Sequence, residues 1–425
     1  MRRRDFMRYS GRTALGLAAL SAAGFSREAF AQTPIWFNTP FHGGDAKAME
    51  IIVKKFNEEQ KGMRIDLTQG GWTEYYAQLY NAVVAGVAPN IGICHDFRFL
   101  STAPALYPLA DTPVGNVLDM LKLSADDFVP PAWDLANVDG VQYGIPLDQS
   151  MIGFYYNRAI FRDAGLDPDN PPATREAFEN ACEAIKKIGK IPFHPALSSA
   201  PRWIRRAWFM LHWGGEGELI ENDKAAFNTS QGLEALQYLV DMVQKRGWNN
   251  PGTDANKQFL AGELGMCYNG TWFYLTVAES GIDYGSGVMP TFYKKASAWG
   301  STHNLVLPKQ PPGKANEERL STAAKAIRLI SDNTYLWGQY GGHVPTRKAA
   351  QEDQRLLTSD TWNKTLKNFV KMSRGGIFQM EPHHPKIVEF DAAIEPFIQE
   401  AYNGTLTPKD ALDKAEKAAN DALKG

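Results

Sequence analysis

Several side chains suited to holding a small polar molecule occur where a predicted strand ends in a loop. Asp96 follows the apolar run 91–94 after one residue, His95, and Trp272 comes shortly after the turn residues Asn269 and Gly270. A carboxylate accepts two hydroxyl donors, and an indole offers a flat apolar face. This combination predicts a binding site for a ligand that has both hydroxyl groups and apolar C–H faces.

The loop after the first predicted strand offers a different kind of contact. Phe41, His42 and Gly43 separate a strand at 34–38 from the helix that follows. Free backbone N–H groups at the start of a helix can hold a hydroxyl, carboxylate or phosphate oxygen. Trp72 stands in the same place ahead of the next helix. The alternative for the loop is an ordinary tight turn.

The other candidates also have purely structural alternatives. Asp96 could form an ion pair with Arg98, and His95 could face the core. Trp272 could be a core residue, because tryptophan is buried to a large extent on average. The Asn-Gly turn before Trp272 favours an exposed position instead.

Motifs for catalysis are missing from the sequence. It contains no GxSxG, no Walker loop and no GxGxxG after the first strand. His383 and His384 lie too close to Glu381 for a standard metal site. We therefore predict a protein that is not an enzyme and has neither cofactor nor metal. A periplasmic carbohydrate-active hydrolase stays the alternative, since two catalytic carboxylates could lie among 47 Asp and Glu residues.

The composition disfavours several classes of partner. The chain has 45 Lys and Arg residues against 47 acidic ones, without basic runs. We therefore expect no nucleic acid and no anionic lipid as partner. Cys94, Cys182 and Cys267 have neither CxxC nor metal-ligand spacing, so we interpret them as small buried hydrophobes. A Cys94–Cys267 bridge is the alternative.

Residues 1–31 have the pattern of a twin-arginine export signal. Arg3 and Arg4 stand ahead of a weakly apolar run at 13–25, which is too short and too polar to span a bilayer. Ala-Phe-Ala at 29–31 supplies a small–x–small cleavage site. Cleavage after residue 31 would leave a soluble periplasmic protein with a net charge of about −6.

Alternating strands and helices surround the candidate residues. Strands at 34–38, 63–67 and 91–94 are separated by helices that Asp45 and Thr73 can cap. This order is typical of an α/β fold with a parallel sheet. Further along the chain we predict a strand at 151–156, a helix capped by Thr174, a helix at 230–245, a strand at 265–268 and two helices after Lys386 and Thr407.

Four segments along nearly the whole predicted mature chain resemble the carbohydrate-binding family of ABC-transporter solute-binding proteins, which includes maltose-binding protein. They are AGVAPN at 85–90; YGIP at 143–146 with YYNRAIF at 155–161 and AGL at 164–166; FLAGELGM at 259–266 with NGTW at 269–272; and YNGT at 402–405 with AL at 411–412. Each motif alone is weak, but four in order behind an export signal are specific. Asn90 and Cys267 depart from the family pattern.

The resemblance implies a two-lobed α/β periplasmic-binding-protein fold with a hinge and a ligand cleft between the lobes. The N-terminal lobe would contain residues 32–147 and about 299–343, and the C-terminal lobe residues 148–298 and about 344–425. The implied function is capture of a sugar or oligosaccharide by lobe closure and its delivery to the transmembrane permease subunits of an ABC importer. The resemblance also implies a monomer.

The resemblance further assigns positions that bind the ligand. Trp272 matches an aromatic that stacks on a sugar, and Asp96 matches an aspartate that bonds sugar hydroxyls. Trp203 matches another cleft aromatic, with a core position as its alternative. The remaining expected ligand-binding residues are Phe41, His42, Gly43, Trp72, His95, Asp148, Ser150, Gly300, Ser301 and His343.

The charge of the ligand has two interpretations. An anionic ligand, such as a uronate or a glycerol phosphodiester, could bind to one of several arginines near the candidate residues: Arg98, Arg202, Arg205, Arg206 and Arg347. The aromatic-rich set of candidates favours a neutral oligosaccharide. We therefore predict a neutral ligand, with the anionic one as the alternative.

Overall fold

The computed structural model describes residues 33–198 and 200–424, so the predicted export signal lies outside the described residues. The strands are β1 (Thr33–Thr39), β2 (Met63–Gln69), β3 (Gly92–His95), β4 (Asn137–Val138), β5 (Val141–Gln142), β6 (Gly144–Asn157), β7 (Ile191–His194), β8 (Ile220–Glu221), β9 (Lys224–Ala225), β10 (Leu264–Gly270), β11 (Tyr284–Gly287), β12 (Ala298–Val306), β13 (Val344–Pro345) and β14 (Phe378–Gln379). Most of the predicted strands are therefore present.

Helices make up much of the rest. The α-helices are α1 (Gly44–Glu59), α2 (Trp72–Val84), α3 (Phe99–Thr102), α4 (Val117–Leu121), α5 (Arg158–Asp163), α6 (Arg175–Lys187), α7 (Pro201–Gly214), α8 (Ser230–Gln244), α9 (Ala255–Leu260), α10 (Tyr274–Glu279), α11 (Lys314–Asp332), α12 (Thr334–Gly341), α13 (Lys348–Gln351), α14 (Gln354–Leu357), α15 (Lys367–Arg374), α16 (Ile387–Tyr402) and α17 (Pro408–Lys424). Two short 3₁₀ helices, η3 (Asp96–Arg98) and η7 (Thr271–Phe273), carry candidate site residues. None of the helices in the described part of the chain is long and apolar enough to cross a membrane.

The strand predicted at 151–156 is the middle of the much longer β6, which is buried along all 14 residues. Its first half pairs with β12, from Gly144 opposite Val306 to Met151 opposite Gly300. Its second half pairs with β10 and β11. These pairings are antiparallel, and with the parallel pairs β7–β10 and β12–β14 they make the sheet around β6 a mixed one. The reason is that β6 and β12 cross the molecule in opposite directions. The parallel arrangement predicted for the first three strands is confirmed, since β1 pairs with β2 in parallel and Phe37 forms a parallel bridge to Ile91.

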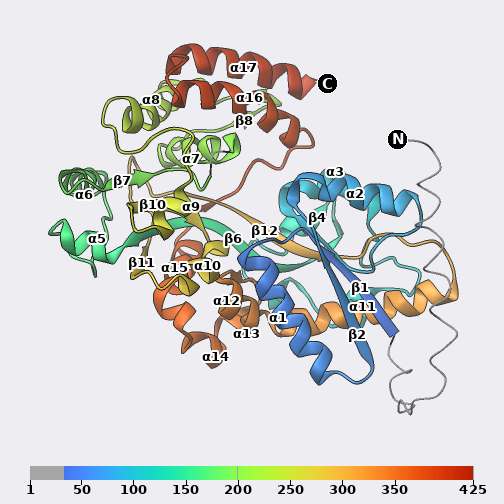
Figure 1. Ribbon diagram of the computed structural model, residues 1–425. Helices are drawn as coiled ribbons and strands as arrows, with labels where there is room; N and C mark the ends of the chain where they lie inside the picture. Colours follow the sequence, from blue (N-terminus) through green and yellow to red (C-terminus); the bar gives the residue numbers. More distant parts are fainter. Residues whose placement is uncertain (1–32, 199, 425) are drawn as a thin grey trace, which may run out of the picture.

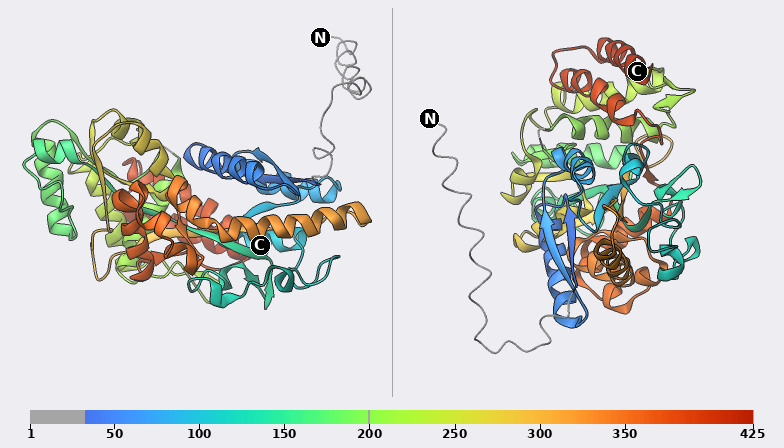
Figure 2. Two further views of the ribbon diagram at one scale, coloured as in Figure 1. Left: turned by 90° about the horizontal axis from the view of Figure 1, so that it is seen from below. Right: turned by 90° about the vertical axis from the view of Figure 1, so that its right-hand side faces the viewer.

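The molecule has two lobes, with β6 and β12 running between them (Figure 1). One lobe contains β1, β2, α1, α2 and the long helix α11; the other contains α5 to α8, β7, α16 and α17 (Figure 1). Seen from below, α11 extends toward one end of the molecule and α5 and α6 lie at the other (Figure 2). The third crossing is β13, which pairs with β6 through Val344 and Pro345.

Two of the three predicted helix caps are wrong. Gly43, with φ 60°, is the N-cap of α1, and Asp45 instead lies buried in the first turn. Gly71 is the N-cap of α2, so Thr73 lies inside that helix. Thr174 does cap α6, since its side chain accepts a hydrogen bond from the Ala177 N–H at 3.2 Å. Asp45 is not a cap because its carboxylate binds His343, as described below.

The helical spacing in the sequence predicts one buried face for the second helix, made of Tyr76, Leu79, Tyr80, Val83, Val84 and Val87, and of these only Leu79 is buried. The buried residues of this helix are Tyr75 and Leu79, whereas Tyr80 and Val84 are exposed. The Tyr75 hydroxyl accepts a hydrogen bond from the Ile93 N–H of β3 at 2.8 Å, which fixes the face that α2 turns to the sheet. The cysteine prediction is confirmed: Cys94, Cys182 and Cys267 are free and buried.

Candidate ligand-binding site

Aromatic rings of the N-terminal lobe gather at the carboxyl ends of β1 and β3. Trp72, at the start of α2, lies 4.2 Å from the ring of His95, and His95 stacks on Phe97 at 4.8 Å. These three side chains are half-buried, and we call them the first aromatic face. The buried rings of Phe41 and His303 lie against Trp72, at 6.0 Å and 5.4 Å.

His95 is a neutral imidazole in this arrangement. Its Nδ1 lies 2.8 Å from the Tyr76 hydroxyl. Burial, followed by the charges of His303, Arg206 and Arg98, lowers the pKa of His95 well below its ordinary value. Arg206 belongs to α7 of the other lobe, so its influence places the two lobes close together at this point.

Asp96 lies next to the first aromatic face and is buried. Its carboxylate accepts a hydrogen bond from the Thr302 N–H of β12 at 3.1 Å. Burial raises the pKa of Asp96 to about 6, against the lowering effect of that hydrogen bond. Within residues 33–198 and 200–424, no ion pair joins Asp96 to Arg98, whose guanidinium stacks on Tyr76 at 4.8 Å. The ion pair with Arg98, which was the structural alternative for Asp96, is therefore absent from the described residues.

Trp203 and Trp272 form a second aromatic face on the C-terminal lobe. Both are half-buried, and their ring centres are 5.8 Å apart. A Cβ on Gly270 would lie 2.2 Å from the Trp272 ring, so glycine is required at the turn before it. The backbone oxygen of Trp272 lies 2.9 Å from the place of a Cβ on Gly44, at the start of α1. Trp208 and Trp213, the other tryptophans of α7, are core residues.

Arg206 and Glu381 form an ion pair behind the second aromatic face, and this pair was not predicted from the sequence. Arg206 stacks on Trp299 at 3.6 Å and on Trp203 at 5.0 Å. Glu381, just after β14, accepts hydrogen bonds from the Trp299 indole at 2.8 Å and from Arg206 at 3.3 Å. No local signal in the sequence reveals this role, because only the pairing of β14 with β12 brings Glu381 to Trp299.

Asp148 and His343 lie in a buried polar network where the chain crosses between the lobes. Asp148 accepts hydrogen bonds from the His303 N–H at 3.1 Å and from its ring nitrogen at 2.9 Å. His343 binds Asp148 at 3.2 Å and Asp45 of α1 at 2.9 Å. Its Nδ1 also lies 3.1 Å from the Thr271 hydroxyl, so His343 contacts elements of both lobes.

The two carboxylates favour the protonated form of His343. Burial alone would lower the pKa of His343, but Asp45 and Asp148 raise it above its ordinary value. Burial likewise opposes the charge of Asp148, while His303 and His343 lower its pKa. These shifts favour the charged forms of both His343 and Asp148.

Asp148, His303 and His343 also have the geometry of metal ligands, with their ligand atoms within 4.8 Å of one another. Within residues 33–198 and 200–424, no other three His, Cys, Asp or Glu side chains lie close enough together to share a metal ion. The Trp337 indole N–H also donates to Asp148. With the His303 donors it already satisfies both carboxylate oxygens by hydrogen bonds, so the group is accounted for without an ion.

The remaining predicted residues lie on β6 and β12 or at the start of α1. Ser150 and Ser301 are opposite each other on β6 and β12 and are buried. Gly300 is covered by Phe378, whose ring lies 2.0 Å from the place of a Cβ. His42 and Gly43 are exposed at the start of α1. The hydroxyl of Ser301 helps to lower the pKa of Asp96.

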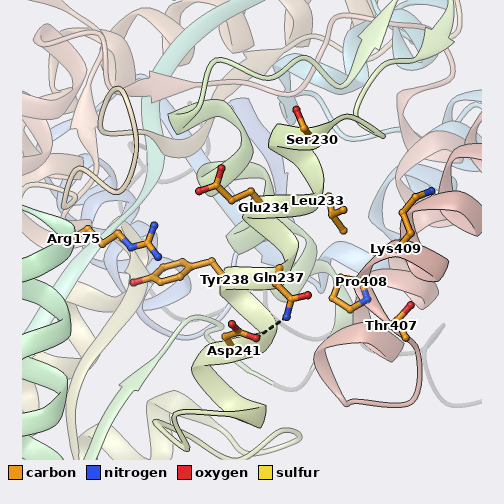
Figure 3. A pocket seen from close by; sticks show the side chains of 10 residues that line it. All are labelled: Arg175, Ser230, Leu233, Glu234, Gln237, Tyr238, Asp241, Thr407, Pro408 and Lys409. Carbon is orange, nitrogen blue, oxygen red and sulfur yellow. Dashed lines mark hydrogen bonds between the residues drawn. The ribbon is translucent and has the colours of Figure 1, made fainter.

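A separate pocket of about 490 Å³ lies in the C-terminal lobe, between α8 and the start of α17. Figure 3 shows its lining residues, among them Arg175, Tyr238 and Asp241. The Arg175 guanidinium stacks on Tyr238 at 4.1 Å, and Asp241 accepts a hydrogen bond from Gln237 at 2.6 Å (Figure 3). None of the predicted site residues lines this pocket, and these two charged groups are already paired within the protein.

The comparisons with known proteins agree with this architecture. Residues 52–369 match the family described as bacterial extracellular solute-binding protein. The chain is 24% identical over 446 residues to the sn-glycerol-3-phosphate-binding periplasmic protein UgpB of Escherichia coli strain K12, covering 97% of this chain and 96% of that protein. The UgpB protein of Salmonella typhimurium strain LT2 is also 24% identical, with 97% of each chain covered.

Solved structures show the same fold. Maltose-bound MalE3 of T. maritima superposes with a TM-score of 0.77 at 18% identity, covering 90% of this chain and 98% of that chain. The cyclic α-maltosyl-1,6-maltose binding protein of Arthrobacter globiformis superposes with a TM-score of 0.73 at 22% identity, covering 92% and 99%. The two-lobed α/β periplasmic-binding-protein fold predicted from the sequence is therefore confirmed.

Proposed function

The chain belongs to the bacterial extracellular solute-binding protein family, and we propose that it captures a carbohydrate between its lobes. In this proposal the loaded protein delivers the carbohydrate to the permease subunits of an ABC importer and does not convert it. The structural neighbours named for maltose and for cyclic maltosyl-maltose support a carbohydrate ligand.

One observation carries this proposal: each lobe presents a half-buried aromatic face next to buried polar groups. The first face is Trp72, His95 and Phe97, and the second is Trp203 and Trp272. Sugar rings bind to such sites through stacked apolar faces and hydrogen-bonded hydroxyls. Asp96 lies between His95 and Phe97 of the first aromatic face in the chain. Its carboxylate would accept hydrogen bonds from the ligand hydroxyls.

The other predicted residues take supporting positions in this proposal. Asp148 and His343 hold the crossing segments together, Phe41 supports Trp72, and His42 and Gly43 lie at the rim. Ser150, Gly300 and Ser301 form the β6–β12 floor between the faces. The proposed lobes are residues 32–147 with about 299–343, and residues 148–298 with about 344–425.

Export belongs to the same proposal. The pattern of residues 1–31 supports twin-arginine export to the periplasm, with cleavage after residue 31, and the mature protein would work as a monomer. The periplasmic relatives support this location.

A second candidate ligand is a glycerol phosphate or phosphodiester. The curated relatives favour it, because both carry the name sn-glycerol-3-phosphate-binding protein. Both candidates place the ligand between the lobes, so they differ in charge and not in site.

A thermal-shift screen of the purified protein tests the carbohydrate proposal. The panel contains monosaccharides, oligosaccharides, polyols and glycerol phosphates, with amino acids, peptides and polyamines as the contrasting set. A ligand at about a hundredfold excess over Kd should add roughly 2.7 kcal/mol to the free energy of unfolding. Stabilisation by members of the contrasting set alone would refute the proposal, and so would product formation that persists through repurification.

A further inference from the structure

Two buried arginines of α7, Arg205 and Arg206, are neutralised inside the protein, and Arg206 is the one that stacks on Trp203. Arg205 pairs with Glu381 at 3.5 Å, with Glu395 at 3.4 Å and also with Asp391. Arg206 pairs with Glu381 at 3.3 Å. Two cations therefore face three carboxylates, and the group carries a net negative charge.

Glu381 has acceptor capacity left over. One of its carboxylate oxygens, Oε1, takes the hydrogen bonds from Trp299 and Arg206. The other, Oε2, is buried and accepts no hydrogen bond from the residues that the structure describes. A buried acceptor without a donor is costly, and a ligand hydroxyl would satisfy it.

Asp96 adds a second carboxyl group from the other lobe. Asp96 accepts a hydrogen bond from the backbone N–H of Thr302, and Glu381 accepts one from the side chain of Trp299. Both donors belong to β12 and are three residues apart. The negative charge of Glu381 also contributes to the raised pKa of Asp96. Asp96 and Glu381 therefore bring two carboxyl acceptors to the same strand, β12.

Two further arginines lie nearby and need to be considered. Within residues 33–198 and 200–424, Arg98 and Arg202 have no carboxylate within 4.0 Å. Arg98 stacks on Tyr76 at 4.8 Å, and Arg202 stacks on Trp203 at 5.3 Å. Arg202 is exposed to solvent, which screens its charge. Neither one forms an ion pair with Glu381, and the Nε of Arg98 is buried without a hydrogen-bond partner among the described residues.

We propose that the interlobe site selects a neutral polyhydroxylated ligand and rejects phosphorylated or carboxylated ones, with Glu381 as a residue that determines this specificity. This inference rests on the proposed function, since it concerns the same site. Hydroxyl groups donate to both acids, whereas a phosphate at neutral pH brings negative charge and only acceptors. Arg206 does not attract an anion because Glu381 already neutralises it.

Matched pairs of ligands test the proposal on the wild-type protein. The probes are maltose with maltose 1-phosphate, glucose with glucose 6-phosphate, galactose with galacturonate, and glycerol with sn-glycerol 3-phosphate. Isothermal titration gives Kd for both members of each pair. We expect the neutral member of a binding pair to bind at least tenfold more tightly than its anionic partner.

Two variants test the role of Glu381. Glu381→Gln keeps the size of the side chain and removes its charge, so Arg206 becomes free to attract an anion. The ratio of anionic to neutral Kd should fall at least tenfold in this variant. The matched control is Glu395→Gln, which removes a carboxylate that pairs with Arg205 but contacts neither Arg206 nor Trp299; its ratio should stay within threefold of wild type. Urea unfolding curves establish that each variant is folded.

The outcomes separate this inference from the proposed function. Binding of an anionic member as tight as that of its neutral partner, in the wild-type protein, overturns the charge selection and leaves carbohydrate capture standing. This comparison decides the question even if Glu381→Gln does not fold. An unchanged ratio in folded Glu381→Gln overturns the role of Glu381. Binding only to amino acids, peptides or polyamines overturns both the inference and the proposed function.

Discussion

Asp96 combines a buried position with a carboxyl group that titrates near neutrality. Burial raises its pKa to about 6, because the charged form loses more hydration than the hydrogen bonds from Thr302, Ser301 and Phe97 replace. Ligand hydroxyls would supply the missing donors to the ionised form. Ligand binding and proton binding therefore compete at Asp96.

This competition predicts a pH dependence of affinity. The ionised fraction of Asp96 falls from about nine-tenths at pH 7 to about one-tenth at pH 5, so the affinity should fall about tenfold over this range. The stability of the ligand-free protein should change in the opposite direction. The folded state binds the extra proton, so the contribution of Asp96 to stability falls as pH rises from about 4 to about 6.

Calorimetric titrations at pH 5, 6 and 7 check the prediction, with Asp96→Asn as the control. This variant should bind weakly with an affinity that is flat across the range. An affinity of the wild-type protein that rises as the pH falls would contradict a role for the ionised carboxylate.

Trp272 is a residue whose two possible roles can now be separated. Its half-buried indole contacts Trp203 and leaves part of its surface open. We expect Trp272→Ala to weaken ligand binding by about 1.5–3 kcal/mol, through lost stacking and apolar contact. The unfolding midpoint of the ligand-free protein should change little.

The matched control for Trp272→Ala is Trp208→Ala. Trp208 is fully buried in α7, so its loss should cost about 3–5 kcal/mol of folding stability. Titration and unfolding curves on the same preparations compare the two variants. A Trp272→Ala protein that is as unstable as Trp208→Ala, yet binds normally, would remove Trp272 from the site.

At the scale of elements, His343 joins four separate segments. It contacts Asp45 of α1, Asp148 of β6 and Thr271 of η7 from the loop between α12 and β13. The other groups packed against Asp148 are His303 and Trp337. The raised pKa of His343 means that the folded protein holds this proton more tightly than the unfolded chain does.

The network predicts an alkaline loss of stability. The contribution of His343 is fully present below about pH 6.5 and is lost as the pH rises through the higher pKa of the folded state. His343→Asn should remove this pH dependence and destabilise the protein by about 3–5 kcal/mol, since two buried carboxylates lose their cation. Urea unfolding between pH 6 and 9 measures both effects.

The control for His343→Asn is His383→Asn, which replaces an exposed histidine in the loop before α16. This variant should change stability by no more than about 0.5 kcal/mol. A wild-type stability that is constant from pH 6 to 9 would show that His343 is not charged in the folded protein.

Local sequence patterns predicted the elements better than the contacts between them. The helical spacing of Met49, Ile52, Val53 and Phe56 predicts the buried face of α1, and Thr174 is the predicted cap of α6. Both depend only on neighbours in sequence, and both are confirmed. The true face of α2 depends on a hydrogen bond from Ile93 to Tyr75, which no local pattern shows. Glu381 likewise reaches Trp299 only through pairing of strands that are about eighty residues apart.

At the site, the sequence indicated which aromatic residues stay partly exposed but not which partners the buried polar residues have. Trp72, Trp203 and Trp272 follow loops or begin helices, where a ring can stay partly exposed. Asp148 and His343 are at positions that the family resemblance assigns to ligand contact, but their polar atoms bind each other. A sequence shows the type of a polar side chain and not the partner that already satisfies it.

At the scale of the whole molecule, the lobes are connected by strands that pair with one another. β6 pairs with both β12 and β13, so the three crossings form one unit that can bend as a hinge. Away from this unit, Lys47 of α1 forms an ion pair with Glu279 of α10 at 2.5 Å. Both side chains are about half exposed, so the pair adds little stability on its own.

Hinge bending predicts a more compact molecule when ligand is bound. A ligand that contacts both aromatic faces binds the closed arrangement better than an open one, so it shifts the population toward closure. Small-angle scattering should give a smaller radius of gyration with saturating ligand than without it. Lys47→Ala removes one link between the lobes and should weaken affinity by less than about fivefold, an effect that high salt abolishes. Trp272→Ala at the same ligand concentration should keep the larger radius, because the bridge between the faces is lost. An identical scattering profile with and without ligand, at a concentration where calorimetry shows saturation, would mean that the site is rigid and that the paired crossings do not bend.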